Sequence, residues 1–160
     1  RILTGGERLF GADGFEVAYT PGHANHHVSY RHHRTAFVGD VGGVRIDRGP
    51  VIPPTPPPDI DLPKWHASLE LISGWRPERL AMTHFGSQDD DVQSHLQAVG
   101  ARLDRWAELA RESELQQFSD AIQAEIAEHA PLEIAAAYAQ AAPRDQLYAG
   151  LRRYWDKLEK

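Results

Sequence analysis

The chain has 160 residues, with nine histidines and no cysteine. Apolar residues make up 41% and charged residues 25%, which are the proportions of a globular protein rather than a disordered one. The lack of cysteine excludes disulfides, thiolate zinc sites, iron–sulfur clusters and a cysteine nucleophile. The net charge of −6 disfavours a general affinity for nucleic acid or an anionic membrane. No apolar run is long enough for a transmembrane helix.

The two ends of the chain differ in character. The sequence opens Arg-Ile-Leu-Thr-Gly-Gly, with neither an initiator Met nor a signal-peptide pattern. We therefore expect a piece of a longer, cytoplasmic protein. Residues 87–160 carry eight Lys and Arg against fourteen Asp and Glu, and so supply the entire net charge. Five of the nine histidines lie between positions 23 and 33.

The first part of the chain is predicted to form short strands. Runs rich in β-branched and aromatic residues are separated by Gly-Gly, Asp-Gly and Pro-Gly turn signals. The predicted strands are residues 2–3, 15–19, 28–30 and 35–38. The proline-rich stretch 53–58 can form neither a helix nor a central strand, so we expect an extended loop over the surface.

From Leu62 onward the apolar residues recur at helical spacing. Trp65, Leu69 and Ile72 indicate one face of a helix that ends at Gly74. A further short strand is predicted over residues 79–83.

The last part of the chain is predicted to be helical. The Ser-Gln-Asp-Asp-Asp run at 87–91 is expected to open a long helix, because acidic groups are favourable at a helix N-terminus. Pro131 and Pro143 separate two further predicted helices.

Three short motifs combine a strand, a turn and a side chain of metal-ligand type. Thr20-Pro21-Gly22-His23 delivers a histidine, Phe37-Val38-Gly39-Asp40 a carboxylate, and Met82-Thr83-His84-Phe85-Gly86 a second histidine. Strand ends are where a rigid sheet can hold side chains in fixed positions. Imidazole and carboxylate are the expected ligands for zinc, iron or manganese when thiolates are absent. His23, Asp40 and His84 are therefore the candidate metal ligands.

These motifs, in this order, resemble the second half of the signature of the metallo-β-lactamase superfamily, as in its glyoxalase II-like hydrolases. The resemblance covers residues 1–86. It implies that His23 completes the histidine set of one metal ion, that His84 joins a second ion, and that Asp40 bridges the two. Two zinc ions are implied for the complete protein, although iron or manganese suit the same ligands. In the Pro-Gly-His-x-x-x-His-Val pattern, His27 matches a histidine that is not a ligand.

One part of the signature is absent from this sequence. The superfamily's His-x-His-x-Asp-His motif, which precedes the other ligands, occurs nowhere in the chain. We interpret the chain as an α+β, C-terminal half of an αββα sandwich (residues 1–86), followed by a helical C-terminal extension (residues 87–160). The missing N-terminal half, or another copy of the chain, is the expected partner, and the chain alone is expected to be inactive.

The remaining histidines are given simpler interpretations. His32 and His33 are assigned to a solvated hairpin turn, and His66 to a helix surface or packing position. His26 adjoins the candidate site by sequence. His95 and His129 lie in the helical part and are expected to be exposed.

The resemblance implies a metal-dependent hydrolase acting on a small molecule, in which a metal-bound hydroxide attacks an ester, thioester, lactone or amide. Asp40 would be catalytic as well as a ligand, because it would orient that hydroxide. Two alternatives stay open. One is a non-catalytic protein-interaction module built on an incomplete metallo-domain, and the other is a mononuclear iron oxygenase on the same scaffold. A nuclease is disfavoured by the acidic composition.

Overall fold

The structure is a computed structural model and describes residues 2–159. The strands are β1 (Arg8–Leu9), β2 (Phe15–Tyr19), β3 (Val28–His32), β4 (Thr35–Phe37), β5 (Arg79–Ala81) and β6 (Ser87–Gln88). The helices are the 3-10 helix η1 (Gly39–Gly42) and the α-helices α1 (Leu62–Gly74), α2 (Val92–Glu112), α3 (Leu115–His129), α4 (Leu132–Ala141) and α5 (Arg144–Leu158). None of these helices combines the length and the apolar character that crossing a bilayer requires.

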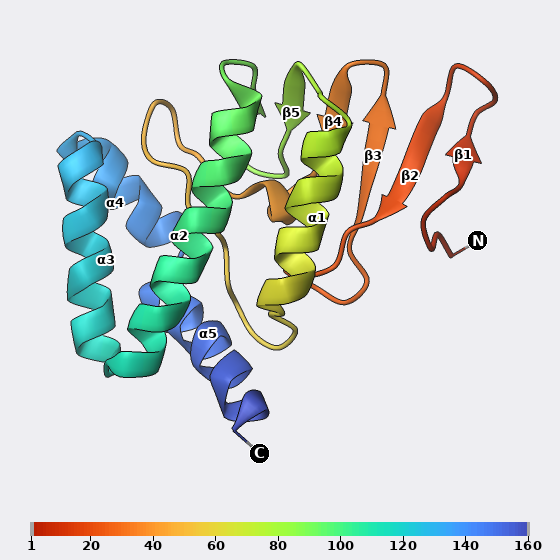
Figure 1. Ribbon diagram of the computed structural model, residues 1–160. Coiled ribbons are helices and arrows are strands. Elements are labelled where there is room, and N and C mark those ends of the chain that lie inside the picture. The colour runs from red at the N-terminus through yellow and green to blue at the C-terminus, as the bar shows by residue number, and fades with distance from the viewer. Residues whose placement is uncertain (1, 160) are drawn as a thin grey trace.

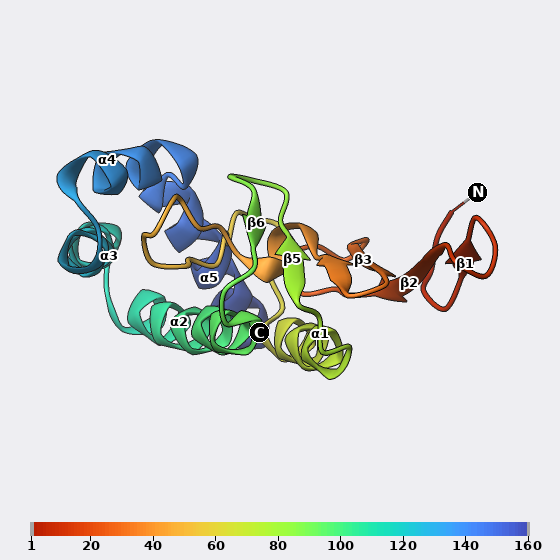
Figure 2. The same cartoon turned by 90° about the horizontal axis from the view of Figure 1, so that it is seen from above.

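The six strands form one sheet in the order β1-β2-β3-β4-β5-β6; Figure 1 labels the first five, and Figure 2 shows β6 beside β5. Neighbours are antiparallel except β4 and β5, which pair in parallel. Because β3 is antiparallel to both β2 and β4, the strands β2, β4 and β5 all run in the same direction. Their C-terminal ends therefore lie at one edge of the sheet, and this edge receives the three candidate ligands.

The two faces of the sheet differ. Helices α1 and α2 lie against one face (Figure 2), where Ala36 and Leu80 are fully buried. The other face carries Phe15, Tyr30 and Phe37, whose side chains share a side by the strand register. The ring of Phe15 lies 6.4 Å from that of Tyr30 and 5.5 Å from that of Phe37. Within residues 2–159, no helix covers this aromatic face over β2 and β3 (Figure 2).

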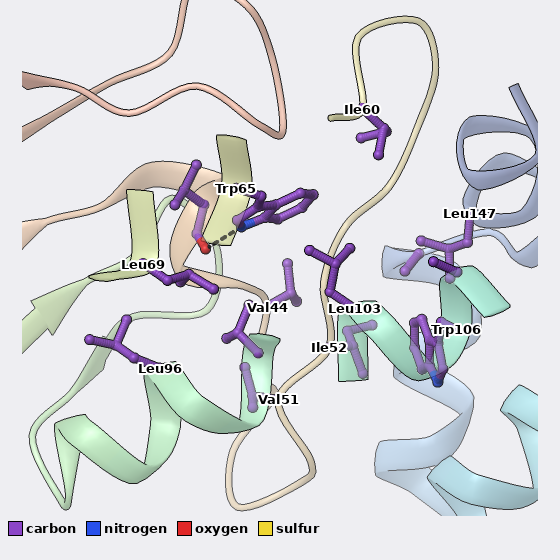
Figure 3. Close-up of a cluster of buried hydrophobic side chains, with 14 of the residues drawn as sticks. Val44, Val51, Ile52, Ile60, Trp65, Leu69, Leu96, Leu103, Trp106 and Leu147 are labelled. Carbon is purple, nitrogen blue, oxygen red and sulfur yellow. Dashed lines mark hydrogen bonds between the residues drawn. The ribbon is translucent and has the colours of Figure 1, made fainter. Parts of the chain in front are cut away.

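One hydrophobic core connects the sheet to the helices. Trp65 of α1 and Trp106 of α2 are fully buried in it, and the segment 44–60 runs between them (Figure 3). Leu147 of α5 joins the same cluster, so the C-terminal helix packs against residues from the first part of the chain. The helical positions predicted at Trp65, Leu69 and Ile72 are confirmed as core positions.

Most of the predicted elements are present, and three differ. Residues 2–3 are not a strand, because the amides of Thr4 and Gly5 instead bind the Glu7 carboxylate in a turn. The strand predicted over 79–83 ends at Ala81. The segment 87–91 does not open a helix: its first two residues pair with β5, and Asp91 caps α2 by accepting from the Ser94 amide.

Candidate metal centre

The three candidate ligands follow the three strands that end at the same edge of the sheet. His23 comes four residues after the end of β2, and Asp40 lies in η1, which follows β4. His84 lies in the turn between β5 and β6. The sheet topology thus brings together side chains that are 61 residues apart in the sequence.

The Asp40 carboxylate stands between the two imidazoles. His23 Nε2 lies 3.7 Å from Asp40 Oδ2, and His84 Nε2 lies 3.5 Å from Asp40 Oδ1. Each histidine therefore faces a different oxygen of one carboxylate. Both separations are longer than a normal hydrogen bond. They are close to the distance of about 3.4 Å that separates two tetrahedral ligands of one zinc ion.

The orientation of His23 is fixed by a backbone carbonyl in the proline-rich loop. His23 Nδ1 lies 2.8 Å from the carbonyl oxygen of Pro54. Since a carbonyl can only accept, Nδ1 carries the proton in this bond, and Nε2 is the ring nitrogen that faces Asp40. The side chain of His23 is also sheltered, with 16% of its surface exposed, and its ring meets that of Trp65 edge to face at 5.7 Å.

The 3-10 turn that carries Asp40 is held by two buried N–H groups. Trp65 Nε1–H of α1 donates to the carbonyl of Val41 over 2.9 Å. The His95 ring of α2 lies with Nε2 2.8 Å from the carbonyl of Gly42, which makes Nε2 the donor. Two carbonyls of η1 that would otherwise be unpaired are satisfied from the two helices behind the sheet.

The turn before His23 is packed against α1. The Ser68 hydroxyl donates to the carbonyl of Pro21 over 2.7 Å, and the Asp61 amide donates to the carbonyl of Gly22. Gly22 has φ of +135°, and a Cβ atom there would lie 2.4 Å from the Cα of Trp65. Only glycine allows this close approach of the turn to the helix.

His27 lies beside the site but makes different contacts. Its Nδ1 is 2.9 Å from the Thr20 hydroxyl, and the Thr20 hydroxyl is 2.8 Å from that of Ser29. Burial, followed by the nearby His23 imidazole, lowers the pKa of His27, against an opposing effect of Asp40. A Cβ on Gly39, where φ is +55°, would lie 2.3 Å from His27 Nε2, so this ring packs on the turn that carries Asp40.

The donor set fits a divalent ion that prefers nitrogen and oxygen ligands. Among residues 2–159, no group of three His, Asp or Glu side chains is placed to hold one ion. The two pairs that do occur share Asp40, so each of two ions would receive one imidazole and one carboxylate oxygen from this chain. A structural zinc site has four ligands, so further donors would be needed to complete either ion.

The other histidines lie outside this arrangement, and two expectations about them are wrong. His95 is buried, with 4% of its surface exposed, because its ring reaches back from α2 to Gly42. His32, expected in the hairpin turn, is instead the last residue of β3, and its ring stacks on that of Phe15 at 4.8 Å. His129 and His26 are exposed, and His33 lies in the turn between β3 and β4. His66 pairs with Asp104 across α1 and α2, with 2.6 Å between Nε2 and Oδ1.

Sequence reasoning missed the groups that hold the ligands. Pro54 contributes only its backbone carbonyl to His23, and a backbone acceptor has no residue signature. Ser68 and Trp65 could have been suspected from their position on one face of α1. His95 could have been suspected from its spacing, because it lies three residues after Val92 and four before Val99, which are buried on the same face of α2.

Comparison with known proteins places this geometry in context. The chain is 36% identical over 97 residues to the metallo-beta-lactamase fold-containing protein ST1585 of Sulfurisphaera tokodaii; the match covers 59% of this chain and 36% of the relative. The chain thus matches little more than a third of the length of that curated relative. No family model matches the chain.

Two solved structures resemble the fold. The crystal structure of ST1585 from Sulfolobus tokodaii, described as an archaeal metallo-beta-lactamase superfamily protein, aligns with a TM-score of 0.53 and 33% identity over 59% of this chain and 37% of that one. The metallo-beta-lactamase family protein TTHA1429 from Thermus thermophilus aligns with a TM-score of 0.65 and 17% identity, over 98% of this chain and 48% of that one.

The chain therefore has an α+β fold that matches the C-terminal half of metallo-β-lactamase fold proteins, with helices following the sheet. The fold class predicted from the sequence is confirmed.

Proposed function

We propose that the chain is the C-terminal, ligand-bearing part of a metal-dependent hydrolase of the metallo-β-lactamase superfamily. The observation that carries the proposal is the placement of Asp40, whose two oxygens each face the Nε2 atom of a different histidine. Within residues 2–159, neither oxygen of Asp40 accepts a hydrogen bond of normal length, and its place between two imidazoles suits a bridge between two cations. We assign His23 to one ion, His84 to the other, and Asp40 to both.

A divalent ion bound at this position would supply Lewis acidity and a lowered pKa for bound water. Zinc is the proposed metal, and iron and manganese suit the same donors. Esters, thioesters, lactones and amides are the proposed substrates, since all present a carbonyl to such a centre.

The residues of this chain have separate tasks in the proposed reaction. Pro54 holds His23 in the tautomer that leaves Nε2 free, and Trp65 and His95 fix the turn that aims Asp40. Asp40, while it holds both ions, would orient a water that approaches between the imidazoles. The His84 side chain is 55% exposed, so a substrate would reach the site from the side on which His84 lies.

The remaining ligands are proposed to come from a polypeptide outside this chain. Residues 2–159 offer two imidazoles and one carboxylate at the site, and the chain matches 36% of the length of its curated relative. We propose that a segment with further histidine ligands packs on the aromatic face formed by Phe15, Tyr30 and Phe37. A second copy of the chain is the alternative occupant of that face.

The first test is zinc binding by the chain itself, measured by competition with a chromophoric chelator. We expect weak binding, which Asp40→Asn abolishes and His23→Gln or His84→Gln each weaken. The matched control is His26→Gln, because His26 is exposed and lies three residues from His23. Equal zinc binding by the parent chain and by Asp40→Asn would refute the ligand assignment.

The second test adds the missing ligands. The chain is joined to an upstream segment that carries a His-x-His-x-Asp-His motif, loaded with zinc, and assayed with a panel of thioesters, lactones and phosphoesters. Turnover that requires both zinc and Asp40 supports the hydrolase. A zinc-loaded protein without turnover on any of the panel would favour the non-catalytic interaction module.

A further inference from the structure

The C-terminal helix α5 packs against the proline-rich loop that orients His23. Leu147, Gly150, Arg153 and Lys157 are spaced three and four residues apart, which places them on one face of α5. The Thr55 hydroxyl donates to the carbonyl of Leu147 over 3.0 Å. Further along, Arg153 Nε and Lys157 Nζ donate to the carbonyl of Pro58 over 3.3 and 2.9 Å. One helix face thus contacts both ends of the segment 55–58.

The contact at Thr55 leaves no spare room. Thr55 is completely buried. A Cβ atom on Gly150 would lie 1.9 Å from the carbonyl oxygen of Thr55 and 3.0 Å from the carbonyl carbon of Pro56. The colliding atoms belong to the backbone, so a side chain at position 150 would have to move the loop itself.

The loop is too stiff to absorb such a movement locally. Thr55 lies between Pro54 and Pro56, and the φ angle of each proline is fixed by its ring. A residue that precedes proline is also restricted to extended conformations, which applies to Thr55 itself. A displacement of Thr55 would therefore carry the neighbouring peptide of Pro54 with it.

The carbonyl of Pro54 is the acceptor for His23 Nδ1–H, at 2.8 Å. The contacts connect α5 to Thr55, Thr55 to Pro54, and Pro54 to the imidazole that faces Asp40. We propose that α5 is a positioning element for His23: through Thr55 it holds the Pro54 carbonyl where it selects the Nδ1–H tautomer of that imidazole. Gly150 and Thr55 are positioning residues more than 30 positions from the histidine in sequence.

The direct test is the tautomer of His23 without any metal. Long-range proton–nitrogen correlation spectra at high pH distinguish Nδ1–H from Nε2–H in each neutral imidazole. We expect Nδ1–H for His23 in the parent chain and a shift toward Nε2–H in Gly150→Ala. The matched control is Gly74→Ala, also at a helical glycine, where a Cβ atom would meet nothing within 4 Å.

A second pair of variants keeps the proposal testable if Gly150→Ala fails to fold. Thr55→Val keeps the shape of the side chain but removes the hydroxyl that donates to Leu147, whereas Thr55→Ser retains that hydroxyl. We expect Thr55→Val to loosen the Nδ1–H preference of His23 and Thr55→Ser to restore it. Circular dichroism confirms that each variant compared is folded. A fixed Nδ1–H tautomer in folded Gly150→Ala and in Thr55→Val would overturn the proposal.

A metal readout extends the test, and this part rests on the proposed function. Loss of a group that orients a histidine ligand weakens metal affinity by about 10–100-fold. We expect a loss of this size in zinc affinity for Thr55→Val, with the parent affinity in Thr55→Ser and Gly74→Ala. If the parent chain binds no zinc, the proposed function fails while the tautomer measurement still decides the role of α5. If zinc binds and Thr55→Val leaves its affinity unchanged, the positioning role toward the metal is refuted.

Discussion

The Nε1–H group of Trp65 donates to the carbonyl of Val41, the residue that follows Asp40, over 2.9 Å. The same tryptophan supports the turn that precedes His23, because its backbone lies against Gly22. One residue of α1 therefore contacts the supports of two candidate ligands. The relative position of His23 and Asp40 depends on how α1 packs on the sheet.

Trp65→Phe should reveal how much the hydrogen bond from Trp65 to Val41 contributes to stability. Phenylalanine keeps most of the buried ring but leaves the carbonyl of Val41 without its donor, which costs about 1–3 kcal/mol. Chemical denaturation should show that loss in the free energy of unfolding. Trp75→Phe is the control, since Trp75 is only partly buried at the end of α1. An equal effect of the two substitutions would contradict the prediction.

Gly22→Ala should be more damaging than a typical surface change. The new methyl group would collide with the backbone of Trp65, and φ of +135° is strained for alanine. We expect a loss of at least about 3 kcal/mol, which is at the upper end for a single substitution. This loss of stability is measured by thermal unfolding monitored with circular dichroism. The control Gly74→Ala should unfold close to the temperature of the parent chain. An unfolding temperature of Gly22→Ala equal to that of the parent would show that the turn is not packed as described.

The buried His95 should make the fold sensitive to mild acid. Burial lowers the pKa of His95 below its ordinary value of 6.5, with the hydrogen bond to Gly42 acting against it and Arg45 adding to it. A depressed histidine pKa means that the unfolded chain binds more protons. The contribution of neutral His95 to the free energy of unfolding is therefore fully present above its ordinary pKa. It is lost as the pH falls from that value toward the lower pKa of the folded state.

His95→Gln removes this titration while keeping an N–H group for the Gly42 carbonyl. The free energy of unfolding should fall less steeply for this variant than for the parent between about pH 7.5 and 5. Denaturation curves across that range measure the difference. His26→Gln, at an exposed position, should follow the parent curve. Identical slopes for the parent and His95→Gln would disprove the contribution of His95.

The aromatic face predicts self-association of the isolated chain. Phe37 is 38% exposed beside Phe15 and Tyr30, and contiguous exposed apolar surface promotes contact between molecules. Light scattering during size exclusion should give a mass that rises with protein concentration. Phe37→Asp should keep the chain monomeric. Leu132→Asp, which alters a leucine that is 86% exposed on α4, should not. A parent chain that stays monomeric at high concentration would contradict this prediction.

Much of the candidate site could be predicted from the sequence because each motif follows a strand. Each of the three ligands comes after a short apolar strand, and β2, β4 and β5 end at the same edge. Periodicity also predicted the buried face of α1. The start of α2 was misjudged, because the acidic run suits a helix start whereas Ser87 and Gln88 gain ladder bonds with β5.

What periodicity and motif could not predict are contacts between groups far apart in the chain. His95 binds a carbonyl 53 residues away, and His23 binds one 31 residues away. Both acceptors belong to the backbone, so no residue type marks them. Such pairs follow from tertiary packing alone.

The three candidate ligands are not held with equal firmness. His23 and Asp40 are each tied to helices or to the proline-rich loop. His84 lies in a turn closed by a long bond of 3.3 Å from the Met82 amide to the Gly86 carbonyl, and more than half of its side chain is exposed. The side of the centre formed by His23 and Asp40 is thus held firmly, whereas the side formed by His84 is held less firmly. Ions and water should enter and leave past His84, and any crowding by a bulky ligand should be relieved there first.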